Sequence, residues 1–213
     1  QFHAVTMGHG DLPQGAGNAD ESGDPFVGRS VMDYYFLPDD VCALAKGGVI
    51  RFDFEPQLRP DGDARHDGRS KRLHFEVFHD YLATDDTFIE LDDNVTDRWG
   101  LPVARIHLDP HPHHRKVGAW LGARAGEILE DVGATSVKLT DIGATSSYLV
   151  MGTCRAGVDP SVSVLDRDCQ LHGTRGVFVV DGSFMPTSGG SPPTLTILAN
   201  SFRVARRIVA MLG

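Results

Sequence analysis

An acidic residue, a glycine-rich loop and a helix start follow one another near the C-terminus, in an order that can bind an electron-rich group. Residues 181–202 read DGSFMPTSGGSPPTLTILANSF, and the apolar run before them, GVFVV at 176–180, predicts a short buried strand. Gly189 and Gly190 allow the backbone to approach a ligand closely, and Pro193 favours the first position of a helix. The N–H groups and the positive dipole end of that helix would suit an anion or a carbonyl. An ordinary strand–loop–helix crossover would show the same pattern.

The segment after this loop has the periodicity of an amphipathic helix. From Thr194 onward, apolar residues recur at helical spacing. They are Leu195, Leu198, Phe202, Ala205, Ile208 and Val209. The C-terminal pattern therefore predicts a strand, a glycine-rich loop and a helix in succession.

A second stretch upstream strengthens the functional interpretation. Residues 151–173 read MGTCRAGVDPSVSVLDRDCQLHG, and VFVVDGSFMPTSGG and PTLTI follow them. This ordered set resembles the C-terminal signature of the glucose–methanol–choline family of FAD-dependent oxidoreductases, from Met151 to about Arg207. Weaker similarities to that family lie at 27–34 (VGRSVMDY) and 95–108 (VTDRWGLPVARIHL). The resemblance touches most of the chain and is specific in its last third.

The resemblance implies a cofactor site made by the loop and the helix start. In the family, Asp181, with Gly182 beside it, would hydrogen-bond near the ribityl and pyrophosphate part of FAD. Pro193, Thr194 and Leu195 would lie against the pyrimidine edge of the isoalloxazine. Reduction leaves negative charge near that edge, and a helix N-terminus stabilises such a charge by about 0.3–1 kcal/mol. A helix cap or a turn residue is the alternative interpretation of Asp181.

The resemblance also implies a proton-handling pair that this sequence lacks. Oxidation of an alcohol needs a base for the hydroxyl proton, and histidine is the usual one. The family places this histidine at the position of Leu149 and its partner, Asn or His, at that of Pro192; neither of these side chains can accept a proton. Tyr148 and His172 are candidate substitutes, and a partner chain could also supply the base. Strand alternation points Tyr148 away from position 149, and His172 suits core or turn packing as well as catalysis.

Other histidines could bind a metal, but their pattern does not favour it. His111, His113 and His114 form a proline-interrupted cluster at the start of a predicted helix, without cysteines or paired carboxylates. A solvated helix end is the simpler interpretation. His74 and His79 lie an odd number of residues apart on a predicted strand and would face opposite sides. We predict no metal site.

Composition limits the partners and the compartment. The formal net charge of −9 argues against nucleic acid and anionic membrane surfaces. No apolar run approaches the length of a membrane span, and residues 1–25 lack the features of a signal peptide. Cys42, Cys154 and Cys169 are too few for a disulfide framework. A Cys154–Cys169 pair is an alternative, but buried thiols fit better and indicate a reducing, cytoplasmic location.

Periodicity and resemblance together divide the chain into three parts. Residues 1–29 have the composition of a linker or arm at the end of an FAD-domain part. Residues 30–139 predict a substrate-type antiparallel sheet domain with one long helix, an α+β arrangement. Residues 140–213 would supply the closing strand and helix of a doubly wound α/β FAD-binding domain. The predicted strands are 47–58, 71–82, 86–93 and 100–110, with another group from Ser136, and the helix is 111–134, closed by Gly133.

The sequence contains no G-x-G-x-x-G, the segment that holds the FAD pyrophosphate in this family. We therefore expect a heteromer in which a partner chain carries that segment and FAD is bound jointly, with a small alcohol or sugar as substrate.

Three functions follow from these observations. The chain is the C-terminal subunit of a split FAD-dependent oxidoreductase with an altered site, a lyase-like non-redox enzyme on an FAD scaffold, or a degenerate subunit that stabilises a partner. We rank the oxidoreductase first, because neutral drift would also erode the cofactor loop.

Overall fold

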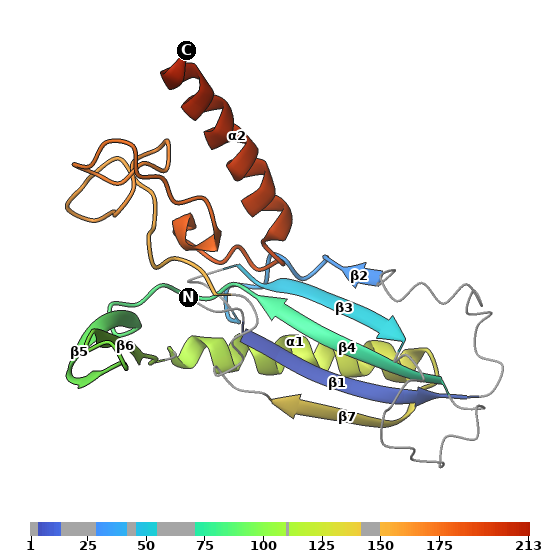
Figure 1. The fold of residues 1–213 in the computed structure, drawn as a ribbon. Coiled ribbons are helices and arrows are strands. Elements are labelled where there is room, and N and C mark those ends of the chain that lie inside the picture. The colour runs from blue at the N-terminus through green and yellow to red at the C-terminus, as the bar shows by residue number, and fades with distance from the viewer. Residues whose placement is uncertain (1–3, 14–28, 42–45, 55–70, 110, 142–149) are drawn as a thin grey trace. The chain divides into compact units, whose positions relative to one another are not determined.

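The structure, a computed structural model, describes residues 4–13, 29–41, 46–54, 71–109, 111–141 and 150–213 (Figure 1). The chain divides into two compact units. The sheet unit comprises Ala4–Asp80 and His113–Ser146. The hairpin–helix unit comprises Gln1–His3, Tyr81–Pro112 and Ser147–Gly213.

The sheet unit is built on five strands in the order β2-β3-β4-β1-β7. Neighbouring strands are antiparallel throughout this sheet. A long helix, α1 (Pro112–Asp131), lies directly before β7 in the sequence. The strands are β1 (Ala4–Leu12), β2 (Arg29–Val31), β3 (Gly48–Phe54), β4 (Lys71–His79) and β7 (Thr135–Asp141).

One face of this sheet packs against α1. On β4, Phe75 and Val77 are fully buried and Leu73 packs beside them, the alternation of a strand with one buried face. The sheet and α1 both contribute to the core, in which Ile50, Phe52, Phe75 and Val77 meet Val117, Leu121, Ala125 and Leu129. The chain leaves α1 at Gly133, whose φ of +81° is the left-handed conformation expected of a helix stop.

Glycines on α1 let the helix lie close to β1. A Cβ atom on Gly118 would lie 3.0 Å from Thr6 Oγ1, and one on Gly122 would lie 2.9 Å from Thr6 Cγ2. Larger side chains there would force the helix away from the sheet. The glycines of the GAWLG segment therefore set the spacing between the two layers.

The opposite face of the sheet carries ion pairs. Arg51 Nε contacts Asp53 Oδ2 at 2.6 Å, and Arg51 Nη2 lies 3.3 Å from Glu76 Oε2. Arg72 Nε contacts Asp11 Oδ1 at 2.9 Å across β4 and β1. Such polar cross-strand pairs are typical of an antiparallel sheet with one apolar face.

The hairpin–helix unit contains one β-hairpin and a long C-terminal helix (Figure 1). The hairpin pairs β5 (Phe88–Thr96) with β6 (Pro102–His107), and the helix is α2 (Thr194–Leu212). Between them, loops and one short 3₁₀ turn, η2 (Gly182–Phe184), build a small core around Leu165, Cys169 and Val204. Cys154 and Cys169 are free thiols, and Cys169 is buried, as predicted.

The structure corrects two sequence-based expectations. Within the segment predicted as a linker or arm, Ala4–Leu12 is a strand, because its backbone pairs with both β4 and β7. The run at 176–180, predicted as a buried strand, pairs at one isolated bridge, Gln170↔Phe178, and Val177 is exposed. A strand needs a continuous backbone partner, and the loop around Gln170 supplies one only locally. The antiparallel sheets and the two long helices are as predicted, and the assignment of residues to substrate and FAD domains stays a prediction.

Among the described residues, no helix is both long and apolar enough to span a membrane.

Removing a core phenyl ring should destabilise the sheet unit. Phe75 is fully buried, so we expect Phe75→Ala to lower the free energy of unfolding by about 3–5 kcal/mol. Phe36→Ala removes the same group from a side chain that is 78% exposed and should change stability by about 0.5 kcal/mol or less. Urea unfolding in a Trp99→Phe background measures this, because Trp120 then reports on the sheet unit. Similar losses from both substitutions would contradict the observed core.

Candidate functional site

The two motifs that carry the sequence argument lie side by side in the hairpin–helix unit. Backbone N–H groups of Gly152, Cys154 and Ala156 donate to the carbonyls of three consecutive residues, Gly182, Ser183 and Phe184, at 3.3, 3.0 and 2.8 Å respectively. The GTCRA segment is thereby fixed along the DGSF segment. Sequence order alone did not predict this pairing.

Asp181 caps the short turn η2. Its Oδ1 accepts hydrogen bonds from the Ser183 backbone N–H, at 2.8 Å, and from the Ser183 hydroxyl. The hydroxyl contact first, and the N–H contact second, hold the pKa of the Asp181 carboxyl below its usual value, against an opposing effect of burial. Both contacts use Oδ1, and no donor of the described residues contacts Oδ2. The cap interpretation is therefore correct for Oδ1, and a cofactor contact of Asp181 stays a prediction.

Gly182 occupies a position with little room for a side chain. A Cβ atom there would lie 3.1 Å from the Val150 carbonyl oxygen and 3.3 Å from Ile197 Cδ1 of α2. Glycine therefore lets three segments meet, namely the turn, the GTCRA segment and the first turns of α2. Ser201 Oγ adds a link by donating to the Val180 carbonyl at 3.1 Å.

The loop before α2 is shaped by consecutive glycines. Gly189 and Gly190 have φ values of +75° and +66°, a conformation that residues with side chains rarely adopt. Ser188, which the sequence analysis did not single out, is buried and accepts a 2.6 Å hydrogen bond from the Tyr81 N–H. Burial, with a smaller contribution from Asp109, raises the pKa of the Tyr81 hydroxyl. The TSGG pattern marks a loop but carries no signal for this long-range contact.

The first turn of α2 is accessible. Pro193 stands at the N-cap position and offers no side-chain hydrogen bond to the helix. Thr194 and Leu195 are exposed, and the first turn contains no acidic residue. The helix starts one residue later than predicted, and no N-cap side chain satisfies its first N–H groups.

The positions considered for proton handling differ in whether the structure describes them and in what they contact. Tyr148 and Leu149 lie outside the described residues, and Pro192 is exposed. His172 Nε2 lies 3.1 Å from Ser163 Oγ, which itself donates to the Asp159 carbonyl at 2.6 Å. His172 therefore donates to Ser163 through Nε2–H and helps to hold this turn. A catalytic role for His172 stays a prediction.

The histidine cluster at the start of α1 is not simply a solvated end. His114 is 2% exposed, and its ring stacks on that of His79 with centroids 6.0 Å apart and planes at 23°. Both side chains belong to the sheet unit, where the helix crosses the end of the sheet. Among the described residues, no three His, Cys, Asp or Glu side chains gather as metal ligands. The solvated interpretation is wrong for His114, because the first turn of α1 already packs on β4.

Comparison with known proteins defines the class. The family model described as GMC oxidoreductase matches residues 83–201, which include the GTCRA segment, the Asp181 turn and the start of α2. The chain belongs to the GMC oxidoreductase family.

Two relatives share most of this chain. It is 33% identical over 197 residues to 6'''-hydroxyparomomycin C oxidase of Streptomyces lividus, covering 89% of this chain and 33% of the relative. It is 32% identical over 205 residues to paromamine 6'-oxidase of Streptomyces fradiae, covering 95% of this chain and 36% of the relative. The chain thus spans about a third of the length of these relatives.

A solved structure is also similar. Pyridoxine 4-oxidase from Mesorbium loti aligns with 96% of this chain and 42% of its own, with a TM-score of 0.48 and 17% sequence identity.

The cap at Asp181 should give a pH-dependent contribution to stability. We expect Asp181→Ala to cost about 0.5–2 kcal/mol at pH 7, because the turn loses its acceptor. The folded pKa is lowered, so this contribution is complete above the unfolded pKa of about 3.9 and is lost as pH falls through the folded value. Urea unfolding followed by circular dichroism at pH 7 and below pH 3 measures the difference between the two proteins.

Asp181→Asn is the matched control, because it keeps an oxygen acceptor and loses the charge. It should cost less than the alanine variant at pH 7 and show little pH dependence. A gap between wild type and Asp181→Ala that is equal at both pH values would contradict the charged cap.

Proposed function

We propose that this chain forms the C-terminal part of an FAD-dependent oxidoreductase that acts on CH–OH groups of an alcohol or sugar. The observation that carries the proposal is the site in the family-matched region, where the GTCRA segment is hydrogen-bonded along the Asp181 turn, and the glycine-rich loop leads from that turn to the start of α2. The names of the two relatives, oxidases of paromomycin-type and paromamine substrates, support a sugar-like substrate.

The residues at this site fit a flavin nucleotide. Oδ2 of Asp181 can accept a hydrogen bond from a ligand hydroxyl. The N–H groups of Thr194 and Leu195 would face an electron-rich ring edge. Bound FAD would supply the acceptor for the hydride of the substrate C–H bond. This chain's share is to position that acceptor and to stabilise negative charge beside it.

The hydroxyl proton needs a separate acceptor. When CH–OH becomes C=O, a hydride leaves carbon and a proton leaves oxygen, so a base within hydrogen-bond distance is required. Leu149 and Pro192 cannot fill this role. Tyr148, His172 or a residue outside this chain remain the candidates, which makes the site an altered version of the family's.

The pyrophosphate of FAD requires a dinucleotide-binding part with a G-x-G-x-x-G segment, carried on a partner chain or on the same, longer chain. We propose that FAD is held jointly by that part and by the α2 end of this chain. A lyase-like enzyme and a stabilising subunit stay as alternatives, because Pro192 is exposed and handles no proton. Both would bind FAD without reduction by an alcohol.

The test begins with the visible spectrum. The isolated 213-residue chain should show no flavin absorbance, whereas the assembly purified with its dinucleotide-binding part should show it. Anaerobic addition of a panel of alcohols, sugars and amino sugars should then bleach the absorbance of the assembly. Flavin retained by the isolated chain would contradict joint binding, and an assembly that no substrate bleaches would contradict the oxidoreductase.

The replaced pair gives a sharper prediction. If another base serves the site, restoring the family residues by Leu149→His and Pro192→Asn should leave the rate of flavin reduction within about tenfold of wild type. If the wild type is silent, the double substitution should raise the rate, because general-base assistance is worth about a hundred- to ten-thousandfold. Rapid-mixing measurements on one substrate panel decide this. If the wild type shows no flavin reduction and the double variant does, the lyase-like or stabilising function would be favoured for the wild type.

A further inference from the structure

Ser188 is a buried residue in the glycine-rich loop that precedes α2. Its neighbours Pro186 and Thr187 are exposed, whereas Ser188 itself is 1% exposed. Its Oγ accepts a 2.6 Å hydrogen bond from the backbone N–H of Tyr81, which lies 107 residues earlier in the chain. Tyr81 is also 1% exposed, so water has little access to this bond. Loss of the acceptor from a buried N–H group is costly, so the bond fixes the loop at this point.

Tyr81 in turn lies near the base of the β5–β6 hairpin. Burial first, and the Asp109 carboxylate second, raise the pKa of its hydroxyl, so the side chain lies within electrostatic reach of Asp109. The Asp109 N–H donates to Thr87 Oγ1 at 3.2 Å, and the Thr87 hydroxyl donates to the Asp109 carbonyl at 3.2 Å. Thr87 and Asp109 flank the two strands of the hairpin. Ser188 therefore links the glycine-rich loop to the base of the hairpin within one compact unit.

A short connection leads from Ser188 to the start of α2. Gly189 and Gly190 follow Ser188 directly, with φ values of +75° and +66° that reverse the chain. Pro193, at the N-cap position, comes three residues after Gly190 and is buried. Because so few residues separate Ser188 from Pro193, a displacement of Ser188 would be transmitted to the helix start.

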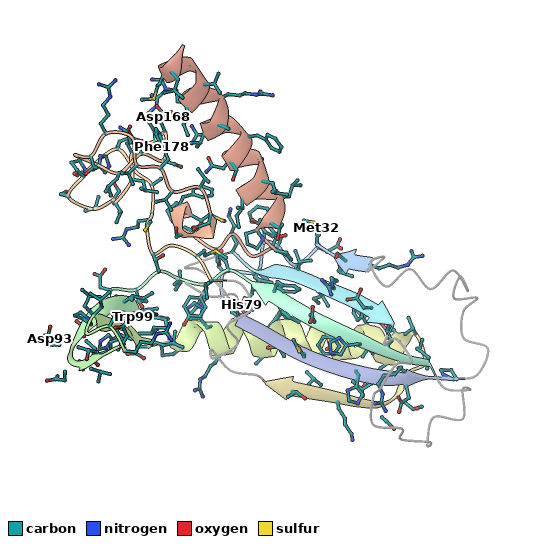
Figure 2. The ribbon with its side chains drawn as sticks, in the orientation of Figure 1. Met32, His79, Asp93, Trp99, Asp168 and Phe178 are labelled. Carbon is teal, nitrogen blue, oxygen red and sulfur yellow. The ribbon has the colours of Figure 1, made fainter. Side chains whose placement is uncertain are left out.

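The middle of α2 is held by contacts of its own. Val204 is fully buried in the small core, and Phe178 packs against the same core. Arg203 and Arg207 tie the helix to Asp168, with nitrogen–oxygen distances of 3.4 and 3.3 Å. Figure 2 labels Asp168 and Phe178 on the loops beside this part of the helix. These contacts fix the helix axis beyond its first turns.

The first turn of α2 depends more on the loop. Pro193 offers no side-chain hydrogen bond to the helix, and Thr194 and Leu195 are exposed. Helix ends without a capping side chain fray readily. The effect of a helix N-terminus on negative charge is also confined to this turn. The order of the turn therefore decides how much charge it can stabilise.

We propose that Ser188 is a positioning residue for the FAD site: its bond to Tyr81 fixes the glycine-rich loop, and the loop presents the uncapped first turn of α2 to the flavin. Ser188 acts through the loop and does not touch the reacting atoms. The proposal rests on the proposed function, because it requires a bound flavin. A bond that serves folding alone is the competing explanation, and it would change stability without changing the properties of the flavin.

The reduction potential of the bound flavin distinguishes the two explanations. Ser188→Ala, made in the flavin-containing assembly, removes the acceptor of the Tyr81 N–H. We expect a reduction potential more negative than that of wild type, because a less ordered helix end stabilises less of the negative charge on the reduced flavin. Titration with dithionite in the presence of a reference dye measures the potential and needs no substrate.

Two further variants serve as controls for the hydroxyl. Ser188→Thr keeps the hydroxyl and should restore the wild-type potential. Thr187→Ala removes a hydroxyl from the adjacent exposed residue and should leave the potential unchanged. Loss of FAD on dilution should be about tenfold faster in Ser188→Ala, the factor expected for one lost hydrogen bond. In Thr187→Ala it should stay within about twofold of wild type.

Hydrogen exchange shows whether the bond itself is lost. In the assembly, the peptide that contains Tyr81 should exchange faster in Ser188→Ala than in wild type, as followed by mass spectrometry, and should be unchanged in Ser188→Thr. If Ser188→Ala does not assemble, Ser188→Cys takes its place in every comparison, because a thiol is a weaker acceptor than a hydroxyl.

Two results would overturn the inference. One is an unchanged potential in Ser188→Ala together with faster exchange at Tyr81, which would leave the bond a role in folding alone. The other is an equal shift of the potential in Ser188→Ala and Ser188→Thr, because the hydroxyl would then not matter. Failure of the proposed function is a different result. A flavin whose potential responds as expected but which no alcohol or sugar reduces would retain the positioning role and reject the oxidoreductase.

Discussion

The hydrogen bonds that join the GTCRA segment to the Asp181 turn are the constraint on which the candidate site depends. Gly152, Cys154 and Ala156 donate to three consecutive carbonyls, so two segments about thirty residues apart in sequence hold a fixed register. Gly182 then keeps this paired structure close to α2, because a Cβ atom there would lie 3.1 Å from the Val150 carbonyl oxygen and 3.3 Å from Ile197 Cδ1 of α2. The closeness of the Asp181 turn to the first turns of α2 is compatible with these backbone contacts and with the small size of Gly182.

The two units are stabilised in different ways. The sheet unit has a regular core between strands and α1, with the glycines of the helix setting the distance. The hairpin–helix unit has little regular structure, and its turns are held by aspartates whose Oδ1 accepts the N–H two residues later. These aspartates are Asp92, Asp97, Asp159, Asp166 and Asp181. Some of the acidic residues of the chain therefore stabilise local turns. Acidification should lower the stability of the hairpin–helix unit, because the pKa values of Asp92, Asp159 and Asp181 are lowered in the folded state.

The candidate site separates two chemical tasks. The residues proposed to hold a flavin, namely Asp181, Gly182 and the first turn of α2, all lie in the region that matches the family model. The resemblance predicts that Leu149 and Pro192 stand where the family has its proton-handling pair. An enzyme without this pair would need its base from another residue or from another chain, whereas a protein that only binds a partner would need no base. The proposed flavin-binding role therefore rests on more of the described residues than any proposed proton transfer does.

The sequence by itself determined the family, the antiparallel sheets, α1 with its stop at Gly133, and the helix that follows the glycine-rich loop, because these depend on local periodicity, turn residues and ordered motifs. Tertiary structure alone decided which segments meet. Ala4–Leu12 has the composition of a loop, yet it becomes a central strand because β4 and β7 pair with both of its edges. The run at 176–180 has the composition of a strand, yet it pairs at a single bridge because no continuous partner lies beside it among the described residues. His114 becomes buried because α1 packs across β4. A strand's partners and a side chain's burial depend on distant residues, which no local pattern encodes.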